Sequence, residues 1–408
     1  MTKYKAKDLR LGIRENANLF LQQLWQVFLI GMTIGVQRTV LPLIAESDFG
    51  LVQGSMTLLL SFVVSFGFVK GSMNFVSGQM AGKFGRRPVL IAGWVFALPI
   101  PFILWLAPNW GWIVAANILL GINQGFAWSM TVTAKHDIVP SSQRGLATGI
   151  NEFAGYGGVA VAGFLTGWLA SGYDPRSMLV VFNALVVLSG LVTAVLAFGE
   201  TRQFAIAHAA PSAKSMSGWE VFALVSWRDK RFQALSQAGL VEKFVDVAMW
   251  VLVPVYLHAQ GVDLFHIGLI TGIYGGVWGA SQLWTGPLSD ALGRKIPAVT
   301  GMLLSGVSLL GIVWSQSLMG WGVSAAMTGV GMALLYPTLI AAVGDLTDPA
   351  WRASSLGVYR FWRDLGYGVG ALVIGVFADM SGAPEIGFWV VSIAMIGSGL
   401  WLARGYRT

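Results

Sequence analysis

Nine ionisable side chains lie deep within long apolar stretches of the chain, where an isolated charge is costly. The set holds five cations and four carboxylates: Arg38, Lys70, Lys243, Arg360, Arg363, Glu152, Glu242, Asp246 and Asp364. A charge at the centre of a membrane-spanning helix costs about 3 kcal/mol even on insertion scales, so such residues face a partner or a cavity. Two interpretations stay open: structural ion pairs, which balanced signs favour, or a pathway for a charged solute and a proton.

Spacing within the set suggests specific pairs. Glu242 and Asp246 are four residues apart, on one face of a helix. Two carboxylates this close in a low-dielectric cavity repel each other as anions, which favours proton uptake. Arg360 and Asp364 have the same spacing, so a local ion pair is the alternative to a role in transport. Lys70 can instead extend its charge along the bundle.

Two neighbouring amides lie in the fourth apolar run, in the phrase GINQGFAWSM. Asn123 and Gln124 could bind a polar solute, or they could bond to adjacent helices, which is at least as common for amides in membranes. Nearby aromatic residues pose the same choice between lining a cavity and packing the bundle. The named candidates are Trp128, Trp250, Trp278, Tyr336, Phe361 and Trp362.

The elements that carry these residues are apolar and helical. The 408 residues are 55% hydrophobic and only 11% charged, whereas an ordinary soluble domain is roughly a quarter charged. Twelve runs between residues 18 and 403 each approach the roughly 20 apolar residues of one membrane span. They lack period-2 alternation, so we expect an all-α membrane protein and not a β-barrel. The four histidines are predicted to fall in loops or at the ends of spans.

Several chemistries are excluded by what the sequence lacks. It has no cysteine, which excludes disulfides and thiolate metal sites, and no histidine spacing typical of a metal site. No phosphate-binding loop motif is present, which argues against ATP-driven pumping. The loops are too short to build a catalytic triad. We therefore expect no enzyme activity, no catalytic residues, no metal and no cofactor.

The formal net charge of +7 has a topological explanation. With the N-terminus placed inside, 20 of the 26 lysine and arginine residues, Lys135 among them, fall in inner segments, and only Arg176 falls in an outer one. This asymmetry follows the positive-inside rule. It predicts a multi-pass protein of the inner (plasma) membrane with both termini in the cytoplasm, and it makes a nucleic-acid partner unnecessary.

The chain repeats itself at a constant offset of 208 residues. The matched pairs are Gly78 and Gly286, Gly85 and Gly293, Arg86 and Arg294, Asp137 and Asp345, Arg144 and Arg352, and Gly149 and Gly357. We predict a cytoplasmic segment 1–17, a six-helix half 18–199, a polar linker 200–231, a second half 232–404 and a tail 405–408. Two such halves with a site between them form a known transporter architecture.

Two related loop sequences carry a family resemblance. Residues 78–90 read GQMAGKFGRRPVL and residues 286–295 read GPLSDALGRK. Both resemble the signature between the second and third helices of each half in the major facilitator superfamily. The resemblance covers essentially the whole chain and implies twelve helices in a six-plus-six, pseudo-twofold fold. The helix-one and helix-five phrases VQRTVLP and NEFAGY are similar to a bacterial branch that includes magnetosome-associated members.

The resemblance also assigns a gate. It implies roles for Gly78, Gly85, Arg86, Arg144, Gly286, Asp290, Gly293 and Arg294. The glycines would allow close helix packing and tight turns. Asp290 would face the start of helix five near Arg144 and hold the opposite half. The first-half equivalent of this acid is Gly82, a departure that puts the first-half contact in question.

The predicted function is secondary active transport. By the resemblance, helices one and seven line the central cavity, which would set Arg38 opposite Asp246 at the 208-residue offset. We expect a monomer in the lipid bilayer that moves a small anionic or zwitterionic solute by alternating access, driven by the proton gradient. The alternatives are a multidrug or amphiphile efflux pump, whose usual helix-four arginine is Asn117 here, and a membrane sensor or scaffold that transports nothing.

Overall fold

The computed structural model describes residues 9–47, 49, 56–170, 173–209, 216–262 and 264–406, and within these ranges every regular element is helical. Some helical residues lack a description of their side chains: 38–40, 42–47, 56–60, 167–168, 170 and 264–265. The predicted contact between Arg38 and Asp246 therefore falls outside the described residues.

The long helices follow one another with short connections. They are α1 (Ala17–Ser47), α2 (Met56–Phe84), α3 (Arg86–Ala97), α4 (Ile100–Leu106), α5 (Trp110–Ile138), α6 (Arg144–Ala170), α7 (Pro175–Leu196), α10 (Lys230–Val247), α11 (Val253–Ala259), α12 (Leu264–Leu292), α13 (Lys295–Trp314), α14 (Leu318–Asp345), α15 (Arg352–Ser381) and α16 (Glu385–Gly405). Short helices α8 (Arg202–Ala207) and α9 (Gly218–Ala223) lie within the predicted linker. Side chains cap several starts; Asn109 Oδ1, for example, accepts from the Gly111 amide at 3.1 Å.

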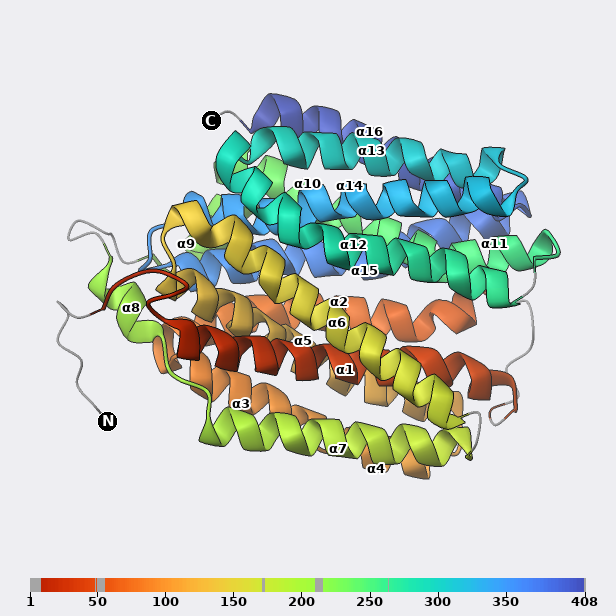
Figure 1. The fold of residues 1–408 in the computed structure, drawn as a ribbon, viewed down its shortest axis with the longest axis horizontal. Helices are drawn as coiled ribbons and strands as arrows, with labels where there is room; N and C mark the ends of the chain where they lie inside the picture. The colour runs from red at the N-terminus through yellow and green to blue at the C-terminus, as the bar shows by residue number, and fades with distance from the viewer. Residues whose placement is uncertain are drawn as a thin grey trace.

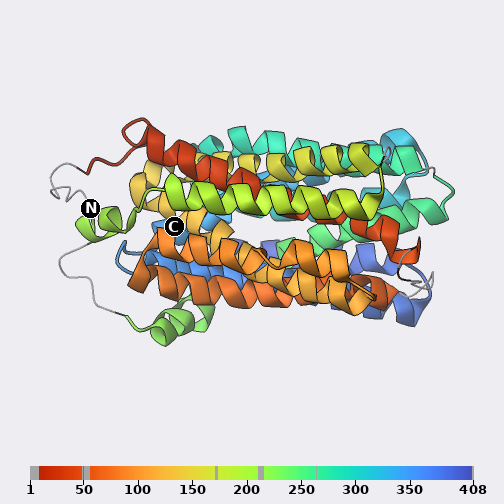
Figure 2. The same cartoon turned by 90° about the horizontal axis from the view of Figure 1, so that it is seen from below.

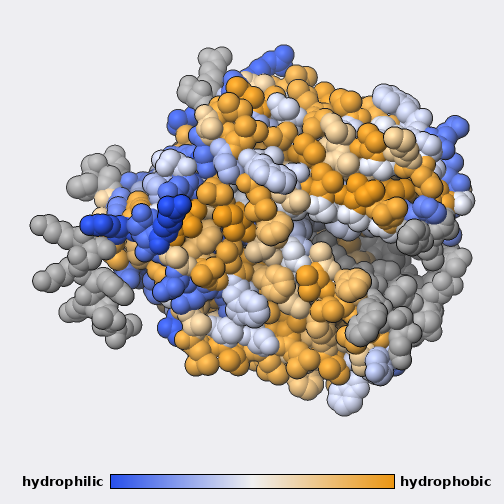
Figure 3. Space-filling model, viewed as in Figure 1, coloured by the Kyte–Doolittle hydropathy of each residue, from blue (hydrophilic) through white to orange (hydrophobic). Residues whose placement is uncertain are grey.

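Eight helices among the described residues are long and apolar enough to cross a membrane. They are α1, α3 together with α4, α5, α7, α13, α14, α15 and α16. The helices α2, α6, α12 and the α10–α11 run lie in the same bundle (Figure 1). Figure 3 shows a broad apolar surface over the middle of this bundle, with hydrophilic residues gathered mainly at the end nearest the chain termini. Such a surface suits contact with lipid.

The helices pack in two groups. Helices α1 to α7 contact one another, as in the pairs α1–α6, α2–α5 and α3–α5, and helices α10 to α16 do the same through α12–α14, α13–α14 and α13–α16. All the long helices run along one axis, and both described chain ends lie at the same end of the bundle (Figures 1 and 2). That end also carries Arg86, Arg144, Arg294 and Arg352, and we call it the arginine end.

The two groups meet along two helix pairs, α2–α15 and α6–α12. Glycines bring the backbones together there. A Cβ atom on Gly145 would lie 2.5 Å from the Gly286 carbonyl oxygen, and one on Gly78 would lie 2.9 Å from the Gly357 Cα atom. No other residue type fits these spacings without backbone movement. Both contacts lie toward the arginine end, whereas Figure 3 shows a hollow between the groups toward the opposite end.

One helix of the second group changes its winding midway. Between α10 and α11, residues Ala248–Leu252 form a π-helical turn (η4), and Pro254 follows at the start of α11. Proline lacks an amide hydrogen, and wider turns of this kind absorb the missing hydrogen bond. The first helix of the predicted second half, which starts at residue 232, is therefore two helices joined by a π turn, placed just beyond Asp246.

Candidate functional site

The intramembrane charges collect between the two groups of helices. Eight of the nine have described side chains, and all eight are between 0 and 4% exposed: Lys70, Glu152, Glu242, Lys243, Asp246, Arg360, Arg363 and Asp364. They come from α2, α6, α10 and α15. The side chains are thus withdrawn from both lipid and water, so their mutual contacts decide what the site can do.

Asp364 on α15 is the centre of the first set of contacts. Its carboxylate accepts from Arg363 Nε at 2.7 Å and from Asn74 Nδ2 at 2.8 Å, and it lies 3.5 Å from Lys70 Nζ. Ser129 Oγ in turn donates to Asn74 Oδ1 at 2.6 Å. Asp364 is therefore paired with α2, which α5 supports through Ser129, and the local pair with Arg360 that the spacing left open does not form.

Asp246 on α10 is the centre of the second set. It accepts from Lys243 Nζ at 2.8 Å, Tyr274 OH at 2.8 Å and Tyr367 OH at 2.9 Å. Three donors of this kind satisfy an ionised carboxylate well. Glu242 lies 3.8 Å from Lys243 Nζ, and neither of its oxygens accepts a hydrogen bond among the described residues. The two carboxylates predicted to act together therefore differ sharply in their surroundings.

Glu152 on α6 begins a polar chain toward the arginine end. Its Oε1 accepts from Trp128 Nε1 at 3.1 Å and from Asn151 Nδ2 at 2.9 Å. Asn151 Oδ1 accepts from Lys135 Nζ at 2.8 Å. Lys135 and His136 lie in the last turn of α5, at the end of the span as expected, but both are fully buried there.

Aromatic rings from both groups enclose the charges. The Tyr336 ring centroid lies 4.2 Å from Lys243 Nζ and 4.8 Å from Arg363 Cζ, distances at which cations interact with the ring face. Tyr156 and Trp278 have centroids 4.1 Å apart and join α6 to α12. Trp128, Trp278 and Tyr336 were candidates from the sequence, whereas Tyr156 was missed. Its position four residues after Glu152 was the available signal, because that spacing puts it on the same helix face.

Two guanidinium groups have unused donors. All three nitrogens of Arg360, and both terminal nitrogens of Arg363, make no hydrogen bond within the described part of the chain. Both side chains are at most 1% exposed. Donors of this kind are costly to bury unless an acceptor meets them, and a planar guanidinium matches a carboxylate or phosphate. The arrangement can therefore hold an anion.

The two predicted amides of helix four face away from this set. Asn123 Nδ2 donates to the Gly93 carbonyl of α3 at 3.0 Å. Gln124 Nε2 donates to the Ile30 carbonyl and to Thr33 Oγ1 of α1, both at 2.9 Å. These are the interhelical bonds that the sequence analysis left open as the alternative. Gln124 Oε1 alone keeps no partner in the described residues.

The gate predicted for the second half crosses between the groups. Asp290 accepts from the Gly145 and Leu146 amides at the start of α6, at 3.0 and 2.9 Å. Arg294 donates to Asp290 at 2.6 Å and to Asp345 at 2.8 Å. Arg144 donates to the same Asp345 at 2.8 Å. Four charged side chains, two arginines and two aspartates, thus form one network that connects α6, α12 and α14 at the arginine end.

The first-half loop makes a different set of bonds. Arg86 pairs with buried Asp137 at 2.7 Å, and Thr201 Oγ1 donates to the same carboxylate at 2.9 Å. Glu200 accepts from the Arg86 and Arg87 amides, both at 3.0 Å. Arg86, Arg87 and Asp137 belong to the first group of helices, and Glu200 and Thr201 follow shortly after its last helix, α7. Gly82 has no atom within 4 Å of the position that a Cβ would take.

Comparison with known proteins gives the family. The model of the Major Facilitator Superfamily matches residues 24–278 and 235–407 of this chain. The chain belongs to the major facilitator superfamily. It is a multi-pass membrane transporter, from a family whose members are generally not enzymes.

Similar proteins extend over almost the full length. An uncharacterized MFS-type transporter of Salmonella typhimurium is 24% identical over 388 residues, which cover 91% of this chain and 92% of that protein. The multi-drug resistance efflux pump PmrA homolog of Lactococcus lactis is 21% identical and covers 92% of this chain and 90% of its own. The crystal structure of the human organic anion transporter MFSD10 (TETRAN) has a TM-score of 0.79 at 16% identity, covering 95% of this chain and 99% of that one.

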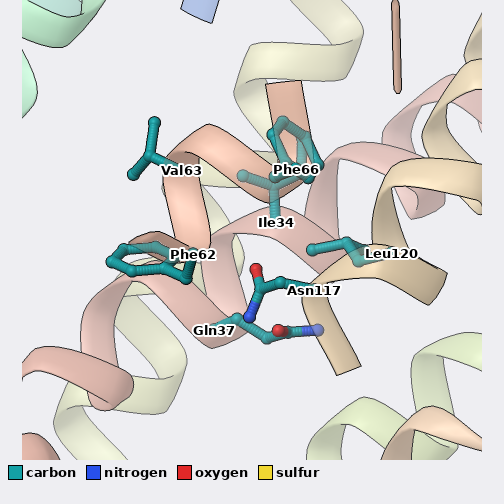
Figure 4. A pocket seen from close by; sticks show the side chains of 7 residues that line it. All are labelled: Ile34, Gln37, Phe62, Val63, Phe66, Asn117 and Leu120. Atoms are coloured by element: carbon teal, nitrogen blue, oxygen red, sulfur yellow. The ribbon is translucent and has the colours of Figure 1, made fainter. Parts of the chain in front are cut away.

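A small pocket of this major facilitator lies next to the charges. It has a volume of about 20 Å³ between α1, α2 and α5, and Figure 4 shows Gln37 and Asn117 pointing into the same space as Phe62 and Phe66. Such a volume holds about one water molecule. The Phe66 ring also lies 5.4 Å from Lys70 Nζ. Phe66 therefore separates this pocket from the charged set.

Metal ligation finds no support in the described part of the transporter. No group of three or more histidine, aspartate or glutamate side chains there has a geometry that could hold a metal ion. His136 Nε2 instead lies 2.8 Å from Thr148 Oγ1, between α5 and α6. This histidine packs the arginine end.

Proposed function

We propose that this transporter moves a small anionic or zwitterionic solute across the inner membrane by alternating access, coupled to proton movement. It would work as a monomer of twelve spans in two six-helix halves, 18–199 and 232–404, with both termini in the cytoplasm. The proton gradient would supply the energy and no cofactor would be needed. The observation that carries the proposal is the pair of buried arginines, Arg360 and Arg363, whose donors are largely unused.

The anion assignment follows from how the carboxylates are engaged. Asp364 is bonded to Asn74 and Arg363, so it has little capacity left to neutralise Arg360. A carboxylate or phosphate on the solute would meet the free guanidinium nitrogens with charge-assisted hydrogen bonds. The rings of Tyr336 and Trp278 would then pack against the apolar part of that solute.

The proton assignment falls on Glu242. A carboxylate buried without a hydrogen-bond donor is costly as an anion, whereas the three donors on Asp246 favour its ionised form. Glu242 also lies close enough to Lys243 for its charge to interact with the Lys243–Asp246 ion pair. We therefore propose that Glu242 takes up and releases the proton and that Asp246 and Lys243 hold the geometry of the site.

Alternating access would use the contrast between the two ends. The charge network around Asp290 and the glycine contacts close the arginine end, and the hollow in Figure 3 lies toward the other end. Rocking of the halves about the charges would open one end as the other closes. With the arginine end in the cytoplasm, as proposed, this arrangement would be that of a carrier closed toward the cytoplasm.

A second candidate function is efflux of amphiphilic compounds. The observation that favours it is the aromatic enclosure of Tyr156, Trp278 and Tyr336, which could stack on a planar, largely apolar compound. The similarity to an efflux pump of Lactococcus lactis points the same way. The buried charges favour the anion proposal, because a purely apolar solute leaves Arg360 without an acceptor.

The test begins with purified protein and a thermal-shift screen against organic anions, siderophore-like chelates, sugars and lipophilic cations. Compounds that stabilise the protein are then followed into proteoliposomes with an imposed pH gradient. We expect stabilisation by anions, and uptake that follows the gradient and is lost in Arg360→Gln. Glu242→Gln should bind the solute but not respond to the gradient.

Matched controls keep the result interpretable. Glu385→Gln and Arg14→Gln remove the same charges at the periphery and should transport normally. Transport that ignores both the gradient and Glu242→Gln would end the proton proposal. Stabilisation by lipophilic cations alone would favour the efflux function, and unaltered biology of the Arg360→Gln and Glu242→Gln variants in cells would favour a sensor or scaffold.

A further inference from the structure

A basic pocket opens at the arginine end, outside the charged set described above. It has a volume of about 630 Å³ and is lined by Leu224, Arg228, Asp229, Lys230, Arg231, Arg404 and Gly405. The first five belong to the end of the linker and the start of α10, and the last two close α16. These two segments touch, since a Cβ on Gly405 would lie 3.6 Å from the Lys230 carbonyl oxygen.

Four cations line this pocket, against one acid. Asp229, the one acid in the lining, accepts from Arg231 Nη2 at 2.8 Å and from the Arg231 amide at 2.8 Å. The hydrogen bond from the Arg231 guanidinium holds the pKa of the Asp229 carboxyl below its usual range, so the pair stays neutral as a unit. Arg228, Lys230 and Arg404 are exposed and form no ion pair within the described residues.

Exposed tryptophans lie on the two segments that form this pocket. Trp227 is 55% exposed beside Arg228, and Trp401 is 47% exposed one turn before Arg404. Tryptophan is enriched where membrane proteins meet the headgroups of the bilayer. Because Arg404 occupies the last turn of a candidate membrane span, the pocket lies at the level where a headgroup would be.

We propose that this pocket binds the headgroup of an anionic phospholipid. Arg228, Lys230 and Arg404 surround the phosphate, while Trp227 and Trp401 lie along the glycerol and upper acyl chains. Basic pockets at the ends of membrane helices recognise anionic headgroups in this way. A dissolved phosphate would use the cations but gain nothing from the tryptophans, so the lipid is the ligand to which both features point.

The bound lipid would hold a segment that touches both helix groups. Phe222, in the same linker segment, lies 5.2 Å from the ring of Phe75 on α2 and 5.6 Å from that of Phe361 on α15. Trp362 Nε1 of α15 donates to Ser226 Oγ at 2.9 Å. A lipid seated at Arg228 therefore stabilises a segment that covers the α2–α15 contact.

The experiment measures binding of short-chain lipids to the purified full-length protein in a neutral detergent. Dihexanoyl phosphatidylglycerol, dihexanoyl phosphatidylcholine and glycerol 3-phosphate are compared by isothermal titration calorimetry. We expect saturable binding of the first, and at least tenfold weaker binding of the other two. The double variant Arg228→Gln/Arg404→Gln should weaken phosphatidylglycerol binding at least tenfold.

Two further variants make the outcome decisive. Arg10→Gln/Arg14→Gln removes the same charge elsewhere at the arginine end and should bind as the unaltered protein does. Arg228→Lys/Arg404→Lys keeps the charge and should retain most of the affinity, which shows that loss in the glutamine variant is not misfolding. Equal binding of phosphatidylcholine, equal binding of glycerol 3-phosphate, or equal weakening by the Arg10/Arg14 pair would each overturn the lipid site.

Discussion

The two loops that follow α2 and α12 share a glycine–arginine sequence but make different contacts. Gly85 and Gly293 both adopt positive φ, at 98° and 80°, and each is followed by an arginine that pairs with an aspartate of its own group. The distances match as well: Arg86 to Asp137 is 2.7 Å and Arg294 to Asp345 is 2.8 Å. Up to this point the loops are copies at the 208-residue offset.

The acidic partner of each loop breaks the symmetry. Asp290 reaches across to the Gly145 and Leu146 amides of the opposite group, where the start of a helix favours negative charge. The corresponding residue, Gly82, has no side chain, and the first loop is capped by Glu200, which follows the last helix of the same group. One copy of the motif therefore joins the two groups, and the other only braces its own.

A pair of arginine contacts retains the symmetry. Arg144 donates to the Gly344 carbonyl at 2.8 Å, and Arg352 donates to the His136 carbonyl at 3.1 Å. Donors and acceptors are both related by 208 residues. Only Arg144 adds a carboxylate partner, Asp345, in the opposite group. The asymmetry between the loops therefore extends to the arginines beside them.

The largest effect on stability is expected from the Arg86–Asp137 ion pair beside the first loop. Asp137→Asn leaves Arg86 without a charge partner at 2% exposure, and breaking a buried pair of this kind costs about 3–5 kcal/mol of unfolding free energy. Asp345→Asn should cost about 1 kcal/mol, because the Asp345 side chain is 25% exposed. Thermal unfolding followed by tryptophan fluorescence measures both, and equal losses would contradict the comparison.

The next effect concerns opening of the arginine end. The chain has no cysteine, so Ala353→Cys, buried at the α2–α15 contact, supplies a single site for labelling by a maleimide. In that background, Arg144→Gln loses a charge-assisted hydrogen bond between the two helix groups, worth about 2 kcal/mol. Because the maleimide reaches the cysteine only when the groups separate, this loss predicts roughly 30-fold faster labelling. Arg352→Gln, whose acceptors are carbonyls, should change the rate less than about fivefold on the same grounds.

A smaller effect should separate the two acidic partners. Asp290→Asn weakens a contact between the groups, and the loss of a favourable charge at the helix start is worth about 1 kcal/mol, or roughly fivefold in labelling rate. Glu200→Gln should lower the unfolding temperature and leave the labelling rate unchanged. Faster labelling in Glu200→Gln would show that the first loop also takes part in opening.

The smallest effect would restore the missing acid. Gly82→Asp places a carboxylate where space is open, one turn beyond Gly78, which meets Ala353 in the first turn of α15. A gain of about 0.6 kcal/mol predicts labelling slowed roughly threefold. Gly82→Ala tests for a simple gain in helix propensity and should not slow labelling. If both variants behave alike, the asymmetry of the loops has no part in closing this end.

Much of this arrangement could be predicted from the sequence, because it depends on composition and repetition. The apolar runs predicted a helical membrane protein, and the two loop motifs gave the family, which the comparison confirms. The burial of the intramembrane charges also followed from their cost. Asp290 was predicted to face the start of helix five, and its two hydrogen bonds lie there.

The pairing within the site could not be predicted, because it depends on which helices meet. Spacing left an Arg360–Asp364 pair open as an alternative, but Lys70 and Asn74 approach from α2 and Arg363 donates to the second carboxylate oxygen. Asp246 likewise gains its partner Tyr274 from α12. The burial of Lys135 in the last turn of α5 was also not predicted, because a lysine at the end of a span usually reaches water, and here Asn151 compensates for its burial.

The glycine contact between Gly145 and Gly286 has a consequence for how this protein can vary. A Cβ on either residue would meet the other's carbonyl oxygen within 2.6 Å, so neither position accepts even alanine while the helices stay in place. Elsewhere in a protein, a larger residue can be offset by a smaller neighbour. Here both partners are already the smallest residue, so no second substitution can rescue the first. Both positions must therefore stay glycine while the sequence changes around them.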